Sequence, residues 1–247
     1  MNKTLYLTTY YGRSFLREKI LLVLLLLFPI LLIAVAAMSA PDGTLPIELD
    51  GTLIDPAPQA GEVLAILNST TALVFVASIT SFFMAFQLKS VLPRLRNAGY
   101  GDFQIAMALV TLMMIVNLYV TAFVSVLALN WISPHDFVGY MLSLFLSSVI
   151  FSTIGLVLAS LVDTRTFGLI SILTLAVLDT AFLENPIYSR RYDEAWTGLM
   201  PAHGTVKMLF RSTFDIGTHW TGDLVSVLFY ELVLILIYLV VVKKSQD

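Results

Sequence analysis

The chain has 247 residues, of which 58% are hydrophobic and only 13% are charged, and its mean hydropathy is +0.87. Soluble domains contain roughly 45–50% apolar and about 25% charged residues, so this composition excludes an ordinary soluble enzyme and predicts an integral membrane protein. The net charge of −3 with scattered basic residues excludes nucleic-acid binding, and the absence of cysteine excludes disulfides, thiolate metal sites and cysteine nucleophiles.

The N-terminal region combines a basic amphipathic segment with an apolar run. Residues 1–19 place apolar and aromatic side chains among basic ones, which is typical of a helix lying in the inner membrane interface. A frayed basic tail is the alternative interpretation. The apolar run 20–38 ends in small residues, as a signal peptide does. Because the run exceeds the usual signal-peptide core of about 7–15 residues, we predict an uncleaved anchor.

Further apolar runs follow along the chain. A transmembrane helix needs about 20 mostly apolar residues, and each of these runs approaches that length. Together they predict an all-α integral membrane protein with one transmembrane domain over residues 1–247 and six transmembrane helices. The predicted spans are 20–38, 71–88, 103–129, 138–161, 166–183 and 223–242.

Basic residues orient the spans, because short cytoplasmic loops are enriched in Lys and Arg. Ten of the fourteen basic residues fall in the N-terminal segment, in the links after the second and fourth spans, and at the C-terminus. The segment 41–62 carries five acidic residues and no Lys or Arg, as expected of an exterior loop. We therefore predict that both termini are cytoplasmic.

Two segments between the spans are predicted to be helical without crossing the membrane. Residues 89–102 predict a short cytoplasmic helix with Pro93 near its start. Its apolar face, which includes Leu92 and Leu95, needs a partner: the membrane, another loop or another protein. Residues 184–222 are too long for a structureless loop, so they predict a re-entrant exterior segment of one or two short helices before the last span.

Motifs for catalysis and nucleotide binding are absent from the sequence. The chain lacks the GxxxxGK[ST] phosphate loop, HExxH and the GxSxG elbow, so we expect no catalytic residue, no bound cofactor and no ATP site in it. The three histidines are far apart in sequence, which favours interfacial histidines over a shared metal site. An intramembrane enzyme is a minority alternative, with Asp179 and Glu231 as its candidate carboxylates.

Glu231 lies within the last apolar run, where a charge is costly and usually faces a cavity, the bundle interior or a partner. We predict that Glu231, together with Asn117, lies on the substrate path or at a dimer interface. The alternative is a structural glutamic acid, protonated or hydrogen-bonded, that faces Asn117. In the second span, Ala77, Ser81 and Ala85 form a small-residue stripe that favours close helix packing.

The order of these parts resembles the membrane subunit of ATP-binding-cassette exporters of the ABC type-2 permease family. The resemblance covers essentially the whole chain, and two stretches carry it at residue level. Residues 92–103, LPRLRNAGYGDF, resemble the family's coupling helix, and residues 199–211, LMPAHGTVKMLFR, resemble its proline-marked segment before the last span. Many members carry an acidic residue just before the coupling helix, whereas this chain has Gln87, Leu88 and Lys89.

The resemblance implies that Leu92, Arg94, Leu95 and Arg96 contact a separate ATPase subunit, which binds ATP and Mg²⁺ on its own chain. It also implies a second permease subunit, identical or different, in the plasma membrane of a bacterial or archaeal cell. The implied function is ATP-driven export of an amphipathic or hydrophobic substrate such as a drug, a peptide or a lipid. The alternative outside this family is a membrane scaffold or receptor component without transport.

Overall fold

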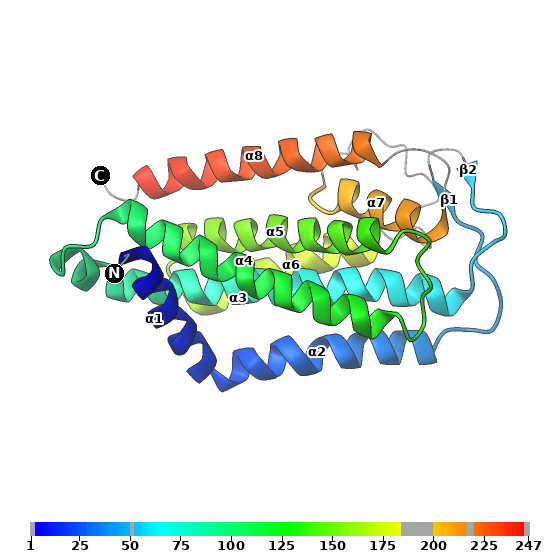
Figure 1. The fold of residues 1–247 in the computed structure, drawn as a ribbon, viewed down its shortest axis with the longest axis horizontal. Coiled ribbons are helices and arrows are strands. Elements are labelled where there is room, and N and C mark those ends of the chain that lie inside the picture. Colours follow the sequence, from blue (N-terminus) through cyan, green and yellow to red (C-terminus); the bar gives the residue numbers. More distant parts are fainter. Residues whose placement is uncertain (1–2, 50–51, 184–199, 216–219, 245–247) are drawn as a thin grey trace.

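A computed structural model describes residues 3–49, 52–183, 200–215 and 220–244. The described chain is a bundle of long helices with a small two-stranded antiparallel sheet at one end (Figure 1). The helices are α1 (Lys3–Arg17), α2 (Lys19–Met38), α3 (Ala60–Asn97), α4 (Asp102–Ala128), α5 (Phe137–Leu161), α6 (Arg165–Ala176), the π-helix η1 (Val177–Leu183), α7 (His203–Phe214) and α8 (Thr221–Lys244). The strands are β1 (Glu48–Leu49) and β2 (Thr52–Leu53).

The structure confirms an all-α protein with membrane-spanning character. Five described helices, α2, α3, α4, α5 and α8, are long and apolar enough to cross a membrane. Each overlaps one of the predicted spans. The remaining predicted span, 166–183, corresponds to α6 and η1, which follow one another directly. The change from α to π hydrogen bonding divides this run into two elements that are each shorter than a span.

Helix α3 begins earlier and ends later than the predicted second span. It starts at Ala60 and runs through Pro93 to Asn97 without interruption. The structure therefore differs from the prediction of a separate helix over 89–102, because most of that segment is the last part of α3. A proline inside a helix removes one backbone hydrogen bond. The helix continues past it because its apolar side chains there pack against α1 and α4.

The centre of the bundle is the contact between α3 and α5. Helix α3 is buried along most of its length, whereas α2 and α8 expose most of their side chains. Gly155 of α5 approaches α3 so closely that an added Cβ would lie 2.5 Å from the Ser78 carbonyl oxygen. The hydroxyls of Ser78 and Ser81 donate to carbonyls of their own helix at 2.6 and 2.7 Å. Small residues with satisfied hydroxyls thus allow the two backbones to approach.

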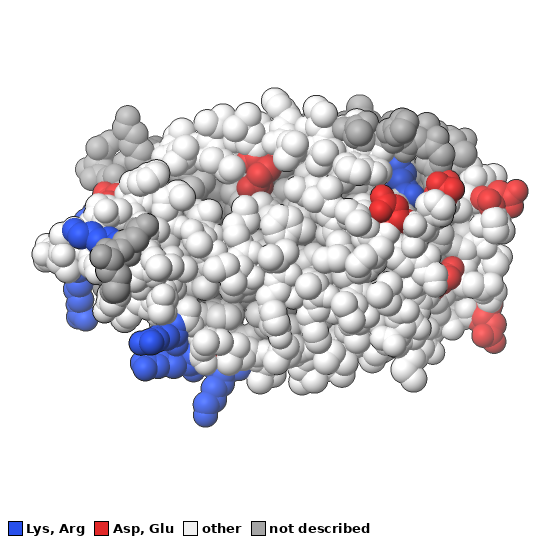
Figure 2. All heavy atoms as spheres, in the orientation of Figure 1, with Lys and Arg blue, Asp and Glu red and all other residues white. Residues whose placement is uncertain are grey.

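The two ends of the bundle differ in charge. The start of α1, the end of α8 and the link between α3 and α4 lie at one end, whereas the sheet and α7 lie at the other (Figure 1). Basic side chains gather at the first end and acidic side chains dominate at the second (Figure 2). We call them the basic end and the acidic end. The start of α1 and the end of α8 both lie at the basic end.

Single cysteines can report which side of a membrane each end faces, because the chain has no cysteine of its own. Asp42 and Asn97 are exposed and lie at the acidic and basic ends. We expect a membrane-impermeant maleimide added to intact cells to label Asp42→Cys. It should label Asn97→Cys only after the membrane is opened. Labelling of both variants in intact cells would contradict a transmembrane bundle.

A second prediction concerns the contact between α3 and α5. Gly155→Ala should lower the midpoint of thermal unfolding, because the added methyl has no room, and such overpacking costs roughly 1–3 kcal/mol. Gly12→Ala in α1 is the matched control, because its Cβ would meet Leu112 Cδ1 at 3.7 Å, an ordinary contact. Both variants gain the same helix propensity. Circular dichroism measures the unfolding midpoint of each variant. Equal midpoints for the two variants would show that the contact between α3 and α5 is not tight.

Candidate functional site

The basic end contains a cavity of about 400 Å³ near the predicted coupling residues. The ends of α3 and α5, the start of α4 and the inner face of α8 line it. Apolar side chains of α3 and α4, including Leu92, form one wall. The charged and aromatic side chains that complete the lining are Lys89, Arg96, Asp102, Asp163 and Tyr238.

Lys89 connects α3 to the end of α5. Its ammonium group donates to the carbonyl oxygens of Val162 at 3.1 Å and Ser160 at 3.5 Å. The last carbonyls of a helix lack partners within the helix and form the negative end of its dipole. A lysine at this position therefore satisfies them and fixes α3 against α5, which gives Lys89 a structural role within this chain.

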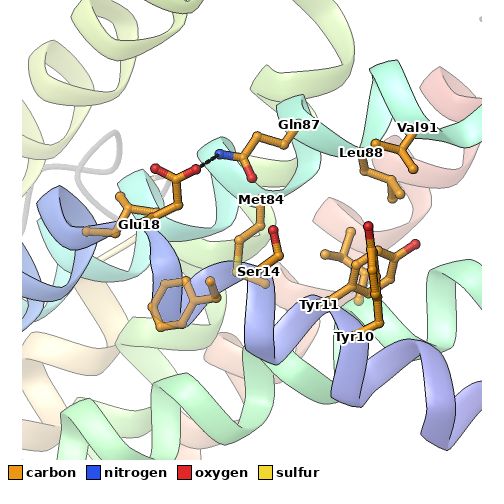
Figure 3. Close-up of a pocket in the computed structure, with 11 residues that line it drawn as sticks. Tyr10, Tyr11, Ser14, Glu18, Met84, Gln87, Leu88 and Val91 are labelled. Carbon is orange, nitrogen blue, oxygen red and sulfur yellow. Dashed lines mark hydrogen bonds between the residues drawn. The ribbon is translucent and has the colours of Figure 1, made fainter.

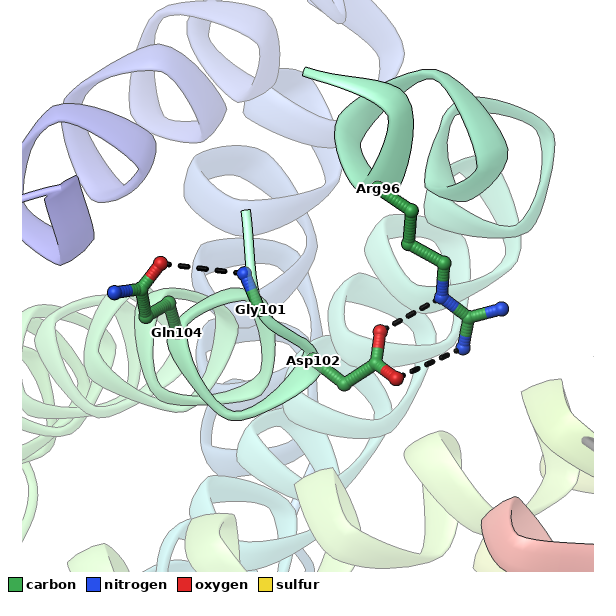
Figure 4. Close-up of polar contacts among 4 residues, drawn as sticks. All are labelled: Arg96, Gly101, Asp102 and Gln104. Atoms are coloured by element: carbon green, nitrogen blue, oxygen red, sulfur yellow. Dashed lines mark hydrogen bonds and ion pairs between the residues drawn. The ribbon is translucent and has the colours of Figure 1, made fainter. Parts of the chain in front are cut away.

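Arg96 closes the turn between α3 and α4 (Figure 4). Its Nε donates to Asp102 Oδ1 at 2.7 Å and its Nη2 donates to Asp102 Oδ2 at 3.2 Å. Gly99, with φ of 80°, ends α3, and the backbone N–H of Gly101 donates to the Gln104 side chain at 3.3 Å. The Arg96 and Asp102 side chains are 41% and 53% exposed, so water screens the pair. The bidentate geometry of the Arg96–Asp102 pair fixes the shape of the turn but contributes little to the stability of the fold.

Leu92 and Leu95 pack inward. Both lie against a small apolar cluster of Leu7 from α1 and Ile105 and Ala108 from α4. The sequence left their apolar face to the membrane, another loop or another protein; in the structure α1 and α4 contact it, and both leucines stay partly exposed. The residues that stay exposed at the tip of α3, which we call the α3 tip, are Pro93, Arg94, Arg96, Asn97 and Ala98.

Of the four predicted coupling residues, only Arg94 is both exposed and without an ion-pair partner in the described part of the chain. Arg96 is committed to Asp102, and the two leucines are committed to the inner cluster. The bundle therefore presents one uncommitted positive charge from this group at the α3 tip.

Helix α1 corresponds to the predicted interfacial helix and packs against the end of α3 (Figure 3). Gln87 of α3 donates to the Glu18 carboxylate at 3.1 Å beside a cavity of about 70 Å³. Burial of the Tyr11 phenol, with Tyr10 nearby, raises the pKa of Tyr11 to about 12. This phenol is therefore neutral at physiological pH, as suits a side chain packed between helices.

Asn117 and Glu231 contact neighbouring residues of α5 rather than each other. Asn117 Nδ2 and Oδ1 lie 2.9 and 3.0 Å from Ser152 Oγ, whereas Glu231 Oε1 lies 2.7 Å from Thr153 Oγ1. The alternative in which Glu231 faces Asn117 was wrong, because α5 provides a different partner for each. Sequence reasoning missed Ser152 and Thr153, although two adjacent hydroxyl residues inside an apolar span were a signal for them.

At the acidic end, α7 is connected to two neighbouring elements. Arg211 of α7 forms an ion pair with Asp223 of α8 at 3.2 Å, and both side chains are largely buried. The Asp179 carboxylate of η1 accepts the backbone N–H of Ala202 at 3.0 Å, where a negative charge favours the start of a helix. These contacts hold α7 inside the end of the bundle. Residues 184–199 and 216–219 of the predicted re-entrant segment lie outside the described residues.

No protein-family model matches this chain, and no curated protein matches it. The functional proposal therefore rests on the geometry of the chain and on the pattern of its sequence.

The inward packing of the two leucines predicts a stability effect in the isolated chain. Leu92→Asp combined with Leu95→Asp should lower the thermal unfolding midpoint of the purified protein, because two carboxylates would replace apolar contacts worth up to about 1.5–3 kcal/mol each when fully buried. Arg94→Glu, at an exposed position between them, should leave the midpoint unchanged. If the double variant unfolds like the wild type, the leucines do not contribute to the fold and remain available to a partner.

Proposed function

We propose that this chain is the membrane subunit of an ATP-driven exporter and that the ATPase is a separate chain. The observation that carries the proposal is the α3 tip, an exposed basic turn at the far point of the basic end (Figure 1). One uninterrupted helix joins this turn to the buried centre of the bundle. A cytoplasmic protein that binds the tip can therefore act on the core directly.

The connections of α3 favour transmission of movement. The helix has 38 residues and is about 57 Å long at the standard rise per residue. The pair of Arg96 with Asp102 joins its end to α4, and Lys89 joins it to α5. In the proposal, an ATPase that binds one arrangement of these helices more tightly shifts the bundle toward that arrangement. Differences in binding energy then open the path for the substrate, without chemistry in this chain.

The proposed topology has six crossings. Helix α6 and η1 together form the fifth, since their combined length approaches the roughly 30 Å hydrocarbon layer. The basic end then lies in the cytoplasm, α1 lies in the inner interface, and α7 belongs to a re-entrant segment on the exterior side. A second permease subunit, identical or different, completes the transporter in the plasma membrane.

The proposed substrate is amphipathic or hydrophobic. The cavity at the basic end supports this class, because one wall is apolar while Lys89, Asp102 and Asp163 supply charge beside it. Its volume of about 400 Å³ lies within the usual range of roughly 300–1,000 Å³ for small-molecule sites.

The proposal predicts that the α3 tip holds an ATPase. The tagged chain, purified from its native membranes in mild detergent, should bring down a subunit that is photolabelled by azido-ATP with Mg²⁺. Arg94→Glu should remove this subunit, because it reverses the uncommitted positive charge at the tip. If the ATPase buries Arg94 in a hydrogen-bonded charge pair, loss of that pair costs about 2–5 kcal/mol, enough to lower retention at least tenfold.

Arg13→Glu is the matched control, because Arg13 is an exposed base of α1, at the same end of the bundle. This variant should retain the ATPase, and both variants should reach the membrane at the wild-type level. An ATP-labelled subunit that stays with Arg94→Glu would refute the docking surface. If the wild-type chain brings down no ATP-binding subunit at all, the protein is a scaffold or receptor component rather than an exporter subunit.

A further inference from the structure

Glu231 is half-buried in the seam between α8 and α5, and its Oε2 atom is enclosed there. Val227 and Leu234, one turn away on either side along the same face of α8, are 2% and 9% exposed. Thr153, which contacts the carboxyl group from α5, is itself buried. The group therefore lies in an apolar seam, where an ionised carboxylate would need a compensating charge.

The hydrogen-bond distances of Thr153 fit a protonated Glu231. Its Oγ1 lies 3.1 Å from the Val149 carbonyl oxygen and 2.7 Å from Glu231 Oε1, and both are donor distances for this hydroxyl. A hydroxyl carries only one hydrogen, so it cannot donate fully to both oxygens. A backbone carbonyl can only accept. The carboxyl group can donate, provided that it is protonated, and 2.7 Å is a typical O–H···O distance.

The second carboxyl oxygen supports the same protonation state. Glu231 Oε2 is buried and has no hydrogen-bond partner in the described part of the chain. A carboxylate would leave a shared negative charge on this oxygen, whereas a carboxylic acid leaves only a neutral carbonyl there. The neutral acid is the less costly form to enclose in this way.

Within the described residues, no charged side chain forms an ion pair with Glu231. Helix α5 carries no Asp, Glu, Lys, Arg or His, and Tyr140 is its one ionisable residue. On α7, Arg211 pairs with Asp223 of α8, about 12 Å from Glu231 along that helix. Other titratable groups on the elements around this seam are His203 and Lys207 of α7, Asp179 of η1, and Tyr230 and Tyr238 of α8. None of them forms an ion pair with Glu231 within the described ranges.

We propose that Glu231 is a reversible proton-binding site within the α5–α8 seam. At neutral pH it is a neutral acid that donates its proton to Thr153, whose own hydrogen goes to the Val149 carbonyl. On release, the proton passes to water, and the Thr153 hydroxyl turns from Val149 to donate to the new carboxylate. Tyr238, on the same face of α8 and about 10 Å away by helical rise, lines the cavity at the basic end. In the proposal, the proton reaches water along this seam, past Leu234 to the cavity.

Infrared difference spectroscopy on the purified full chain in lipid vesicles tests the site without any ATPase partner, so its outcome is independent of the proposed function. At neutral pH the wild type should show the carbonyl stretching band of a protonated carboxyl group. The band should move to lower frequency in D₂O, disappear at alkaline pH and be missing from Glu231→Gln. Glu18→Gln, at an exposed position, should leave the band unchanged.

Two variants of Thr153 test the donation directly and do not require the loss of Glu231. Thr153→Val removes the acceptor, so the band should persist but move to higher frequency, as for an acid with a weaker hydrogen bond. Thr153→Ser keeps the hydroxyl and should keep the wild-type frequency. The absence of a protonated carboxyl band from the wild type at neutral pH would overturn the proposal. A band that does not respond to D₂O or to alkaline pH would show a sealed acid and would overturn reversible binding.

Discussion

The close contact between α3 and α5 positions the helices that pack against one or both of them, which are α2, α4, α6, α7 and α8. Gly155 removes the side chain that would keep the two backbones apart, and Ser78 and Ser81 satisfy their hydroxyls within α3. In a lipid environment the apolar tails compete with apolar side chains, so close backbone packing becomes a main source of association between helices. Helices α2 and α8 lie outside this pair and can expose apolar faces, which a bilayer covers without cost.

Much of the fold could be predicted from the sequence, because a bilayer demands long apolar helices. The predicted span 103–129 became Asp102–Ala128, and 138–161 became Phe137–Leu161. The bounds of α3 could not be predicted in this way. Its continuation through Pro93 depends on contacts with α1 and α4, and contacts between distant segments leave no trace in local periodicity.

The candidate site was predictable only in part, for the same reason. Hydropathy identified Glu231 as a residue that needs a partner, but the identity of the partner depends on which helix packs against α8. Asn117 was a reasonable choice by polarity, yet the structure pairs it with Ser152. The inward packing of Leu92 was equally hidden, because an amphipathic pattern shows that a face is apolar without showing what covers it.

Helix α5 links these features, since neighbouring residues along it contact different helices. Ser152 contacts α4, Thr153 contacts α8, and Gly155 contacts α3, all within about one turn. A displacement of α3 therefore cannot leave the α5–α8 seam unchanged, because a packed interior transmits strain. Under the proposed function, the binding of an ATPase at the α3 tip and the proton on Glu231 act on the same helix. The two events are then coupled through α5, and each must alter the free energy of the other.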